Sequence, residues 1–253
     1  MLKTRIIPCL LLKDGGLVKT IKFANPKYVG DPINAVKIFN EKEVDELIFL
    51  DIEASRQKRD PNYDLIKDLA SECFMPFAYG GGVTTIDQIR KILRLGVEKV
   101  VINAFAIKQP AFIKEASTHF GSSTIIAAVD IKKDFWGHYK VYDHVARKIT
   151  NKDPEKYIQE LVNEGAGEIF LNNVDRDGTY LGLDLPIVAR INSQLPVPLI
   201  ICGGISSLKN IKDAVEQTKV SGAAAGSIFV FQGPHRAVLI SYPSYNELKE
   251  IVG

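Results

Sequence analysis

The stretch Gly81-Gly82-Val83-Thr84 recurs as Gly203-Gly204-Ile205-Ser206, 122 residues further along the chain. Two other landmarks repeat at the same offset: Asp31-Pro32 returns as Asp153-Pro154, and Glu46–Leu50 returns as Glu168–Asn172. Three landmarks at one offset are difficult to obtain by chance, and an internal repeat of this kind weighs heavily in predicting a fold. The chain is therefore predicted to contain two copies of one structural unit.

Short apolar runs recur along the chain and alternate with stretches of helical periodicity. The runs are Arg5–Leu11, Glu46–Asp51, Pro76–Tyr79, Lys99–Asn103, Thr124–Asp130, Glu168–Asn173, Val197–Cys202 and Gly222–Gly226. Eight strands alternating with helices over about 250 residues are typical of a (β/α)8 barrel. We predict an α/β fold, a single (β/α)8 TIM barrel over residues 1–253, with half-barrels at approximately 1–122 and 123–253.

The alternative α/β layout is an open, doubly wound sheet with a nucleotide at its switch point. No G-x-G-x-x-G pattern follows the first apolar run. A closed barrel also explains the two-fold repeat better, so the sequence favours the barrel.

Composition excludes several classes of protein. The chain has 253 residues, 46% hydrophobic and 25% charged, and its formal net charge of +2 does not favour nucleic acid or an anionic membrane as a partner. No apolar run reaches the roughly 18 residues of a membrane helix, and the first residues are interpreted as a buried strand rather than a signal peptide. Three distant cysteines, Cys9, Cys73 and Cys202, suit a reduced, cytoplasmic protein.

The histidines show no metal-ligand spacing and are interpreted as surface or loop residues; they are His119, His138, His144 and His235. We therefore predict no metal site and no cofactor.

Glycine-rich turns follow the third and seventh predicted strands. Gly80-Gly81-Gly82 and Gly203-Gly204 each precede a helix start with two hydroxyl residues, and the next strands end in Asn103-Ala104 and Gly226-Ser227. Glycine lets backbone N–H groups approach a phosphate closely, and a helix N-terminus adds its positive end. The glycines could instead simply permit tight turns. Two such turns at equivalent repeat positions favour phosphate binding, and together they predict a ligand with a phosphate at each end.

The chain resembles the cyclase (synthase) subunit of imidazole glycerol phosphate synthase over about 230 residues, to the neighbourhood of Phe231. The resemblance rests on Arg5–Leu10, Lys13-Asp14-Gly15, Lys19, Phe49–Ile52, Gly80–Gly82, Lys99-Val100, Ile102-Asn103, Val129-Asp130, Gly165–Ile169 and the specific signature Asp175-Arg176-Asp177-Gly178-Thr179. It implies a heterodimer in which a glutaminase subunit docks on the barrel bottom. The barrel then uses ammonia to cleave and cyclise a bis-phosphorylated ribulosyl nucleotide of histidine synthesis.

Residues around the mouth are expected to bind this phosphorylated small molecule. They are Lys19, Asp51, Gly81, Gly82, Asn103, Asp175, Asp177, Gly178, Gly203, Gly204, Gly226 and Ser227.

The catalytic pair of the family is incomplete in this chain. The family uses an aspartate at the end of the first strand and another at the end of the fifth as general acid and base. Asp130 matches the second, but Leu11 stands at the first position, and leucine cannot transfer a proton. Asp14 is a possible substitute, although it belongs to the following loop. Residues at four further mouth positions also depart from the family's small hydroxyl residues: Ala78, Val101, Ala104 and Asn172.

The residues that gate ammonia entry in the family are retained as Arg5, Glu46, Lys99 and Glu168. Charges at the starts of inward-running strands are costly to bury unless they pair, and two bases with two acids can form a closed ring. The alternative role for such a ring is stability alone. The segment Lys132–Lys148 is interpreted as a hairpin, serving either as a lid over the mouth or as a solvated loop.

The retained gate and the lost aspartate predict a paralogue of the cyclase subunit. It resembles those associated with bacterial surface-polysaccharide genes, which implies passage of ammonia to an amidotransferase acting on an acetamido sugar. The alternative is a histidine-pathway cyclase in which Asp130 works alone or with Asp14; drift within an ordinary cyclase would explain Leu11. A third possibility is a phosphate-binding interaction protein without ammonia traffic.

Overall fold

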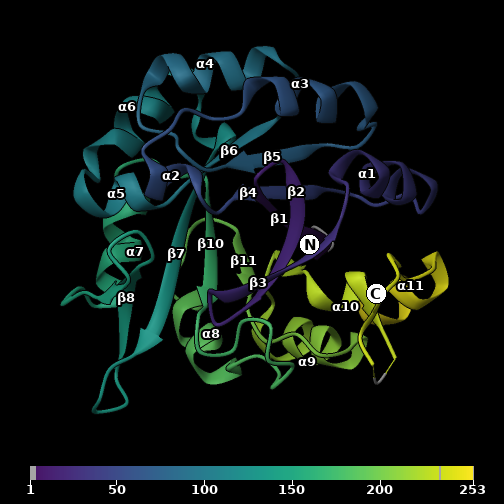
Figure 1. Ribbon diagram of the computed structural model, residues 1–253. Helices are drawn as coiled ribbons and strands as arrows, with labels where there is room; N and C mark the ends of the chain where they lie inside the picture. The colour runs from purple at the N-terminus through teal and green to yellow at the C-terminus, as the bar shows by residue number, and fades with distance from the viewer. Residues whose placement is uncertain (1–3, 234, 253) are drawn as a thin grey trace.

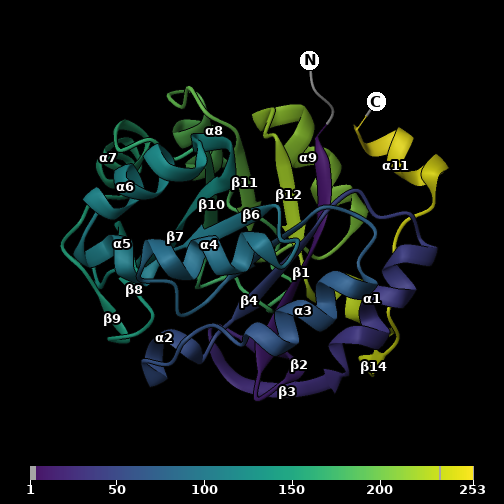
Figure 2. The same cartoon turned by 90° about the horizontal axis from the view of Figure 1, so that it is seen from above.

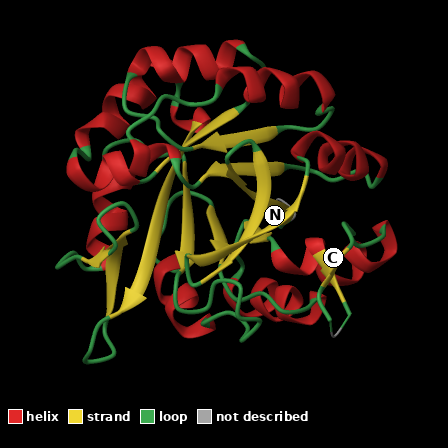
Figure 3. Cartoon of the chain, viewed as in Figure 1, coloured by secondary structure: helices red, strands yellow, loops and turns green. Residues whose placement is uncertain are grey.

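A closed barrel of eight parallel strands forms the centre of the computed structural model, which describes residues 4–233 and 235–252. Helices surround the strands on the outside (Figure 1, Figure 3). The hydrogen-bonded order β10-β11-β12-β1-β4-β5-β6-β7 is closed by parallel pairing between β7 and β10. The barrel strands are β1 (Arg5–Lys13), β4 (Leu47–Asp51), β5 (Phe77–Gly80), β6 (Lys99–Ile102), β7 (Ile125–Lys133), β10 (Glu168–Asn173), β11 (Leu199–Cys202) and β12 (Gly222–Ala225).

Closure confirms the predicted (β/α)8 TIM barrel and excludes the open doubly wound sheet. Each of the eight predicted apolar runs forms one of these strands, although the ends differ by a few residues. The boundary between the two half-barrels remains a prediction from the sequence repeat.

Side chains alternate between two apolar layers along each strand, because successive residues of a strand point to opposite faces. In β4, Ile48 belongs to a cluster inside the barrel, whereas Leu47 and Phe49 pack against the surrounding helices. The inner layer fills the barrel and the outer layer packs against the helices. The polar residues of the strands lie at the two ends of the barrel.

Helix caps repeat between the two halves of the chain. Asp31 and Asp153 cap α1 and α7, each with proline next, and Thr85 and Ser207 cap α4 and α9. The longer helices are α1 (Pro32–Glu41), α3 (Tyr63–Glu72), α4 (Ile86–Arg94), α6 (Ala111–Phe120), α7 (Pro154–Asn163), α8 (Leu185–Asn192), α9 (Leu208–Thr218) and α11 (Tyr245–Val252). Short helical turns are α2 (Ala54–Gln57), α5 (Ala104–Lys108), α10 (Ser227–Val230) and the 3-10 turn η1 (Ser122–Thr124). None of the helices described is long and apolar enough to cross a membrane.

Hairpins extend the barrel where strands continue past its rim. β1 pairs with β2 (Gly16–Ile21), which pairs with β3 (Ala24–Gly30), an excursion that the sequence analysis did not predict. β7 pairs with β8 (Tyr139–Asp143), which pairs with β9 (Lys148–Ile149), confirming the predicted hairpin. After β12 the chain forms β13 (Phe231–Gln232) and β14 (Ala237–Val238), and α11 then packs against α9 (Figure 2).

Candidate functional site

Four charged side chains meet at the floor, where the barrel strands begin. Arg5 donates to Glu46 at 2.6 Å and to Glu168 at 3.1 Å, while Lys99 lies 2.8 Å from Glu168 and 3.6 Å from Glu46. Burial works to lower the pKa of Arg5, but the two carboxylates outweigh it and raise that pKa. Burial also raises the pKa of Glu46 despite its two cationic neighbours. Each charge contacts two of opposite sign, so the four form a closed ring.

The barrel interior above this ring is apolar. It includes the small residues Ala78, Ala128 and Ala224 together with larger aliphatic side chains and Phe170. An apolar interior of this kind offers no hydrogen-bonding partner that would hold an ion along the axis.

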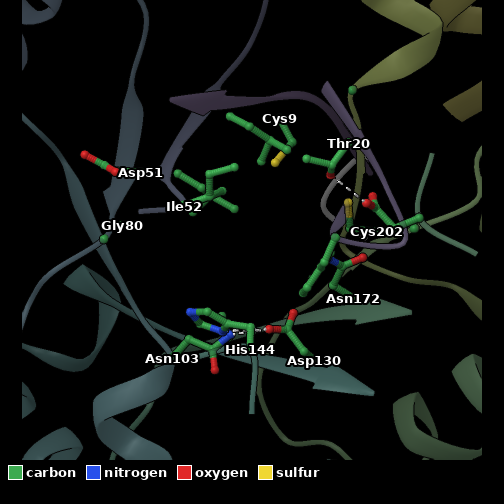
Figure 4. Close-up of a pocket in the computed structure, with 18 of the residues that line it drawn as sticks. Cys9, Thr20, Asp51, Ile52, Gly80, Asn103, Asp130, His144, Asn172 and Cys202 are labelled. Atoms are coloured by element: carbon green, nitrogen blue, oxygen red, sulfur yellow. Dashed lines mark hydrogen bonds and ion pairs between the residues drawn. The ribbon is translucent and has the colours of Figure 1, made fainter. Parts of the chain in front are cut away.

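A cavity of about 710 Å³ opens at the carboxyl ends of the strands. Its two sides differ in chemistry: Figure 4 shows Cys9 and Ile52 across the cavity from Asn103, His144 and Asp130. Leu11 and Leu50 also line it. The active sites of barrels of this fold lie at this end, which makes the cavity the candidate site.

The glycine turns at the mouth are required by backbone packing. Gly81 has φ +126°, and a Cβ there would lie 2.5 Å from the carbonyl oxygen of Asp51. Gly203 has φ +93°, and its Cβ would lie 2.6 Å from Asn172 Oδ1. Gly82 and Gly204 are restricted in the same way, and all four glycines line the cavity. The tight-turn explanation therefore holds, and it leaves the phosphate role as a prediction.

Side chains occupy several of the amides at the starts of the helices that directly follow these turns. Gln88 Oε1 accepts from the amides of Thr84 and Thr85, and Asn210 Oδ1 accepts from Ser206. By contrast, α5 and α10 have no side-chain cap, and their starts at Asn103-Ala104 and Gly226-Ser227 line the cavity. The sequence analysis grouped these two helix starts with the glycine turns, and their role in holding a phosphate remains a prediction.

Lys19 is buried and Asp177 half-buried, and both line the cavity. Lys19 Nζ donates to the carbonyl of Cys9 at 2.5 Å and would lie 2.0 Å from a Cβ at Gly226. Burial lowers the pKa of Lys19. Burial raises the pKa of Asp177 to about 6, although Lys19 and the Thr20 hydroxyl favour its charged form. A Cβ at Gly178 would lie 2.1 Å from the Thr20 carbonyl, so this corner is tightly packed.

Two of the predicted ligand-binding aspartates have other partners. Asp51 lines the cavity, but its carboxylate accepts from Arg59 at 2.7 Å and from the amides of Glu53 and Ala54, which fixes the loop after β4. Asp175 does not line the cavity, because its carboxylate turns to the Lys133 amide at 2.9 Å. Asp175 therefore lies outside the cavity, and its contact with a ligand remains a prediction.

Asp14 lies outside the cavity that Leu11 lines. It is exposed at the β1–β2 turn with φ +50°. The carboxylate of Asp130 remains, with 4% of the residue exposed, and its Oδ2 accepts from Asn103 Nδ2 at 2.8 Å.

His144 lies in the turn after β8, as the sequence analysis expected of a loop residue, and its side chain reaches the mouth. Its Nδ1 is 3.2 Å from Asp130 Oδ2, and the residue lines the cavity. The signal in the sequence was the hairpin itself, because a strand that returns antiparallel to β7 brings its end back toward Asp130. No cluster of three or more potential metal ligands occurs within residues 4–233 and 235–252.

Comparison with known families matches residues 5–235 to the family described as histidine biosynthesis protein. The chain belongs to this family. Among its relatives is an imidazole glycerol phosphate synthase subunit provisionally named hisF2 from Pseudomonas aeruginosa, 53% identical over 248 residues that cover 98% of this chain and 99% of the relative.

Other HisF relatives share less of the sequence. A provisionally named hisF3 of Vibrio vulnificus is 45% identical over 99% of this chain and 96% of its own length. The HisF subunit of imidazole glycerol phosphate synthase from Streptococcus sanguinis is 42% identical over 90% of this chain and 91% of its own. These matches identify a HisF-type subunit, in agreement with the resemblance seen in the sequence.

Proposed function

We propose that this HisF-type chain receives ammonia from a glutaminase subunit docked on the barrel floor, as one half of a heterodimer. The observation that carries the proposal is the closed ring of Arg5, Glu46, Lys99 and Glu168. The ring lies at the end of an apolar interior that leads toward the mouth cavity. Neutral ammonia can cross such an interior, whereas an ion would lose its hydration. In this role the ring acts as the gate.

The ammonia is then passed to an amidotransferase, which acts on an acetamido sugar in surface-polysaccharide synthesis. Leu11 supports this assignment, because it removes a carboxylate that the cyclase family uses for proton transfer. The longer alignments with the hisF2 and hisF3 relatives, 248 and 251 residues against 229 for the streptococcal HisF, also favour a paralogue.

The second candidate is a histidine-pathway cyclase. Asp130, held by Asn103 and His144 beside a large cavity, favours it. In this case the predicted phosphate contacts hold the bis-phosphorylated ribulosyl nucleotide between the starts of α5 and α10. The corresponding residues are Gly81, Gly82, Asn103, Gly203, Gly204, Gly226 and Ser227, with Lys19 and Asp177 at the second end.

Reconstitution tests the assignment. Glutaminase, sugar amidotransferase and acetamido-sugar substrate are combined with and without this chain, and the amidated sugar is measured by mass spectrometry. We expect glutamine-dependent amidation only when the chain is present, with ammonium salts replacing the need for it. Equal amidation without the chain would contradict the proposal, and complementation of a cyclase-deficient bacterium would favour the second candidate.

A further inference from the structure

His144 contacts the one carboxylate that remains from the predicted catalytic pair. Its Nδ1 lies 3.2 Å from Asp130 Oδ2, and 21% of its side chain is exposed. Figure 4 shows the two side chains pointing toward one another at the edge of the open cavity. Asn103 donates to the same carboxylate oxygen at 2.8 Å, so two side chains hold the orientation of Asp130.

The backbone around His144 is fixed by the hairpin that follows Asp130. β7 continues past Asp130 to Lys133, and β8 returns antiparallel and ends at Asp143. The Asp143 carboxylate is buried and accepts from the amides of Val145 and Ala146 at 3.0 and 2.8 Å. These two bonds close the turn in which His144 lies, so the imidazole is held at the cavity by the fold.

The contact with Asp130 determines which ring nitrogen is available. An ionised carboxylate can only accept a hydrogen bond, so the Nδ1 that faces it carries a hydrogen. When the ring is neutral, Nε2 therefore keeps its lone pair. Within the described residues Nε2 has no hydrogen-bond partner. A base oriented through its second nitrogen by a buried carboxylate is the arrangement used for proton transfer in many enzymes.

We propose that His144 is a proton-transfer residue of the mouth, acting through Nε2 with Asp130 as its orienting partner. When ammonia adds to an electrophilic carbon of a phosphorylated ligand, its lone pair forms the N–C bond and the π electrons of that carbon move to its heteroatom. The new ammonium nitrogen loses one proton to Nε2, and the imidazolium returns that proton to the heteroatom. The step needs no oxidant or reductant. It also gives the mouth a proton acceptor in place of the one that Leu11 cannot supply.

This inference rests on the second candidate function, in which the mouth itself consumes the ammonia, and it does not depend on a sugar amidotransferase. The test uses the full chain without glutaminase, the bis-phosphorylated ribulosyl nucleotide as ligand and saturating ammonium salt. We expect measurable turnover. His144→Ala is expected to lower kcat by about 10² to 10⁴-fold while changing KM less than about threefold, and added imidazole is expected to restore part of kcat.

Controls separate proton transfer from folding. His138→Ala changes an exposed histidine of the same hairpin and is expected to leave kcat within about twofold. His144→Gln keeps a polar side chain and is expected to lose activity without imidazole rescue. Absence of turnover by the unmodified chain, or His144→Ala activity within threefold of it, overturns the inference. Loss of glutamine-driven sugar amidation with normal ammonium-driven turnover would instead count against the proposed function.

Discussion

At the mouth, β1 and β4 of the first half end near Leu11 and Leu50, whereas β7 and β10 of the second half carry Asp130 and Asn172 at the matching places. The glycine turns do not differ in this way. Gly81 and Gly203 both adopt positive φ and both lie against the backbone of a neighbouring strand end. The two halves therefore share their framework and differ in their chemistry.

The difference shows which positions the fold constrains. A side chain at Gly81 or Gly203 would collide with backbone atoms, so packing requires glycine at both. Leu11 is half-buried at the cavity wall and leaves space in front of it, so an exchange of aspartate and leucine there costs the fold little. Loss of a catalytic group at a strand end can thus occur without loss of the barrel.

An aspartate at position 11 would make the mouths of the two halves alike, and this change is expected to have the largest effect on turnover. Leu11→Asp places a second carboxylate opposite Asp130 and should raise ammonium-driven turnover of the ribulosyl nucleotide by about 10² to 10⁴-fold. Steady-state kinetics of the isolated chain measure the change. Leu50→Asp, on the adjacent strand, is the matched control and should give no comparable gain. An unchanged rate in Leu11→Asp would show that the first half lacks more than this one carboxylate.

At the floor, Glu46 and Glu168 occupy equivalent positions of the repeat, although Arg5 and Lys99 both belong to the first half. Glu46→Gln and Glu168→Gln each leave Arg5 and Lys99 short of one partner, and each should lower the free energy of unfolding by about 3 kcal/mol. Urea unfolding measures this loss. Glu155→Gln breaks a more exposed pair with Arg190 and should cost at most about 1 kcal/mol. Unequal losses of unfolding free energy in Glu46→Gln and Glu168→Gln would show that the two positions are not equivalent.

The glycine turns compare the two predicted phosphate sites. Gly81→Ala and Gly203→Ala are each expected to weaken inorganic phosphate binding about tenfold, because the displaced backbone moves the amides that face the cavity. Isothermal titration calorimetry measures the affinity. Gly15→Ala introduces similar strain at φ +79° with nothing within 4 Å and should leave binding unchanged. If only one of the two substitutions weakens binding, the ligand carries a single phosphate.

The last expected effect concerns pH and the carboxyl group of Asp177 in the second half. Burial raises the pKa of Asp177 from 3.8 to about 6, so the folded state binds its proton more tightly than the unfolded state does. Stability should therefore fall as pH rises from about 4 to 6, and Asp177→Asn should be more stable than the native chain at pH 7 but not at pH 4. Urea unfolding at both values checks this.

Thr20→Val is the companion variant for this measurement. It removes a hydroxyl that donates to Asp177 and should steepen the fall in stability between pH 4 and 6. A native chain whose stability rises through this range would contradict the assignment.

The sequence repeat was sufficient to predict the barrel, because it marks equivalent turns and caps that local packing requires. Strand ends were less accurate: β7 continues to Lys133 rather than ending at Asp130, and β1 continues to Lys13. Both extensions depend on pairing with β2 or β8 beyond the barrel rim, and apolar periodicity within one strand does not report such pairing.

The hydrogen-bond partners of the side chains at the mouth could not be predicted from the sequence either. Asp175 and Asp177 both lie in the turn after β10, yet the backbone path directs the first toward Lys133 and the second toward Thr20. His144 is brought to Asp130 by the return of a hairpin, a tertiary contact with no local motif. Residue type and strand position could therefore identify candidates, but not which of them share a hydrogen bond.

Each charge of the floor ring lies at or next to the first residue of a barrel strand, and the backbone of each strand is held by its neighbours on both sides. The width of the opening between these backbones is thus set by the circumference of the sheet. Any opening of the floor must therefore come from rotation of these long, paired and mostly buried side chains, because the strand backbones do not part. The rate at which the ion pairs exchange, and not a rearrangement of the barrel, would then set how fast a small molecule passes.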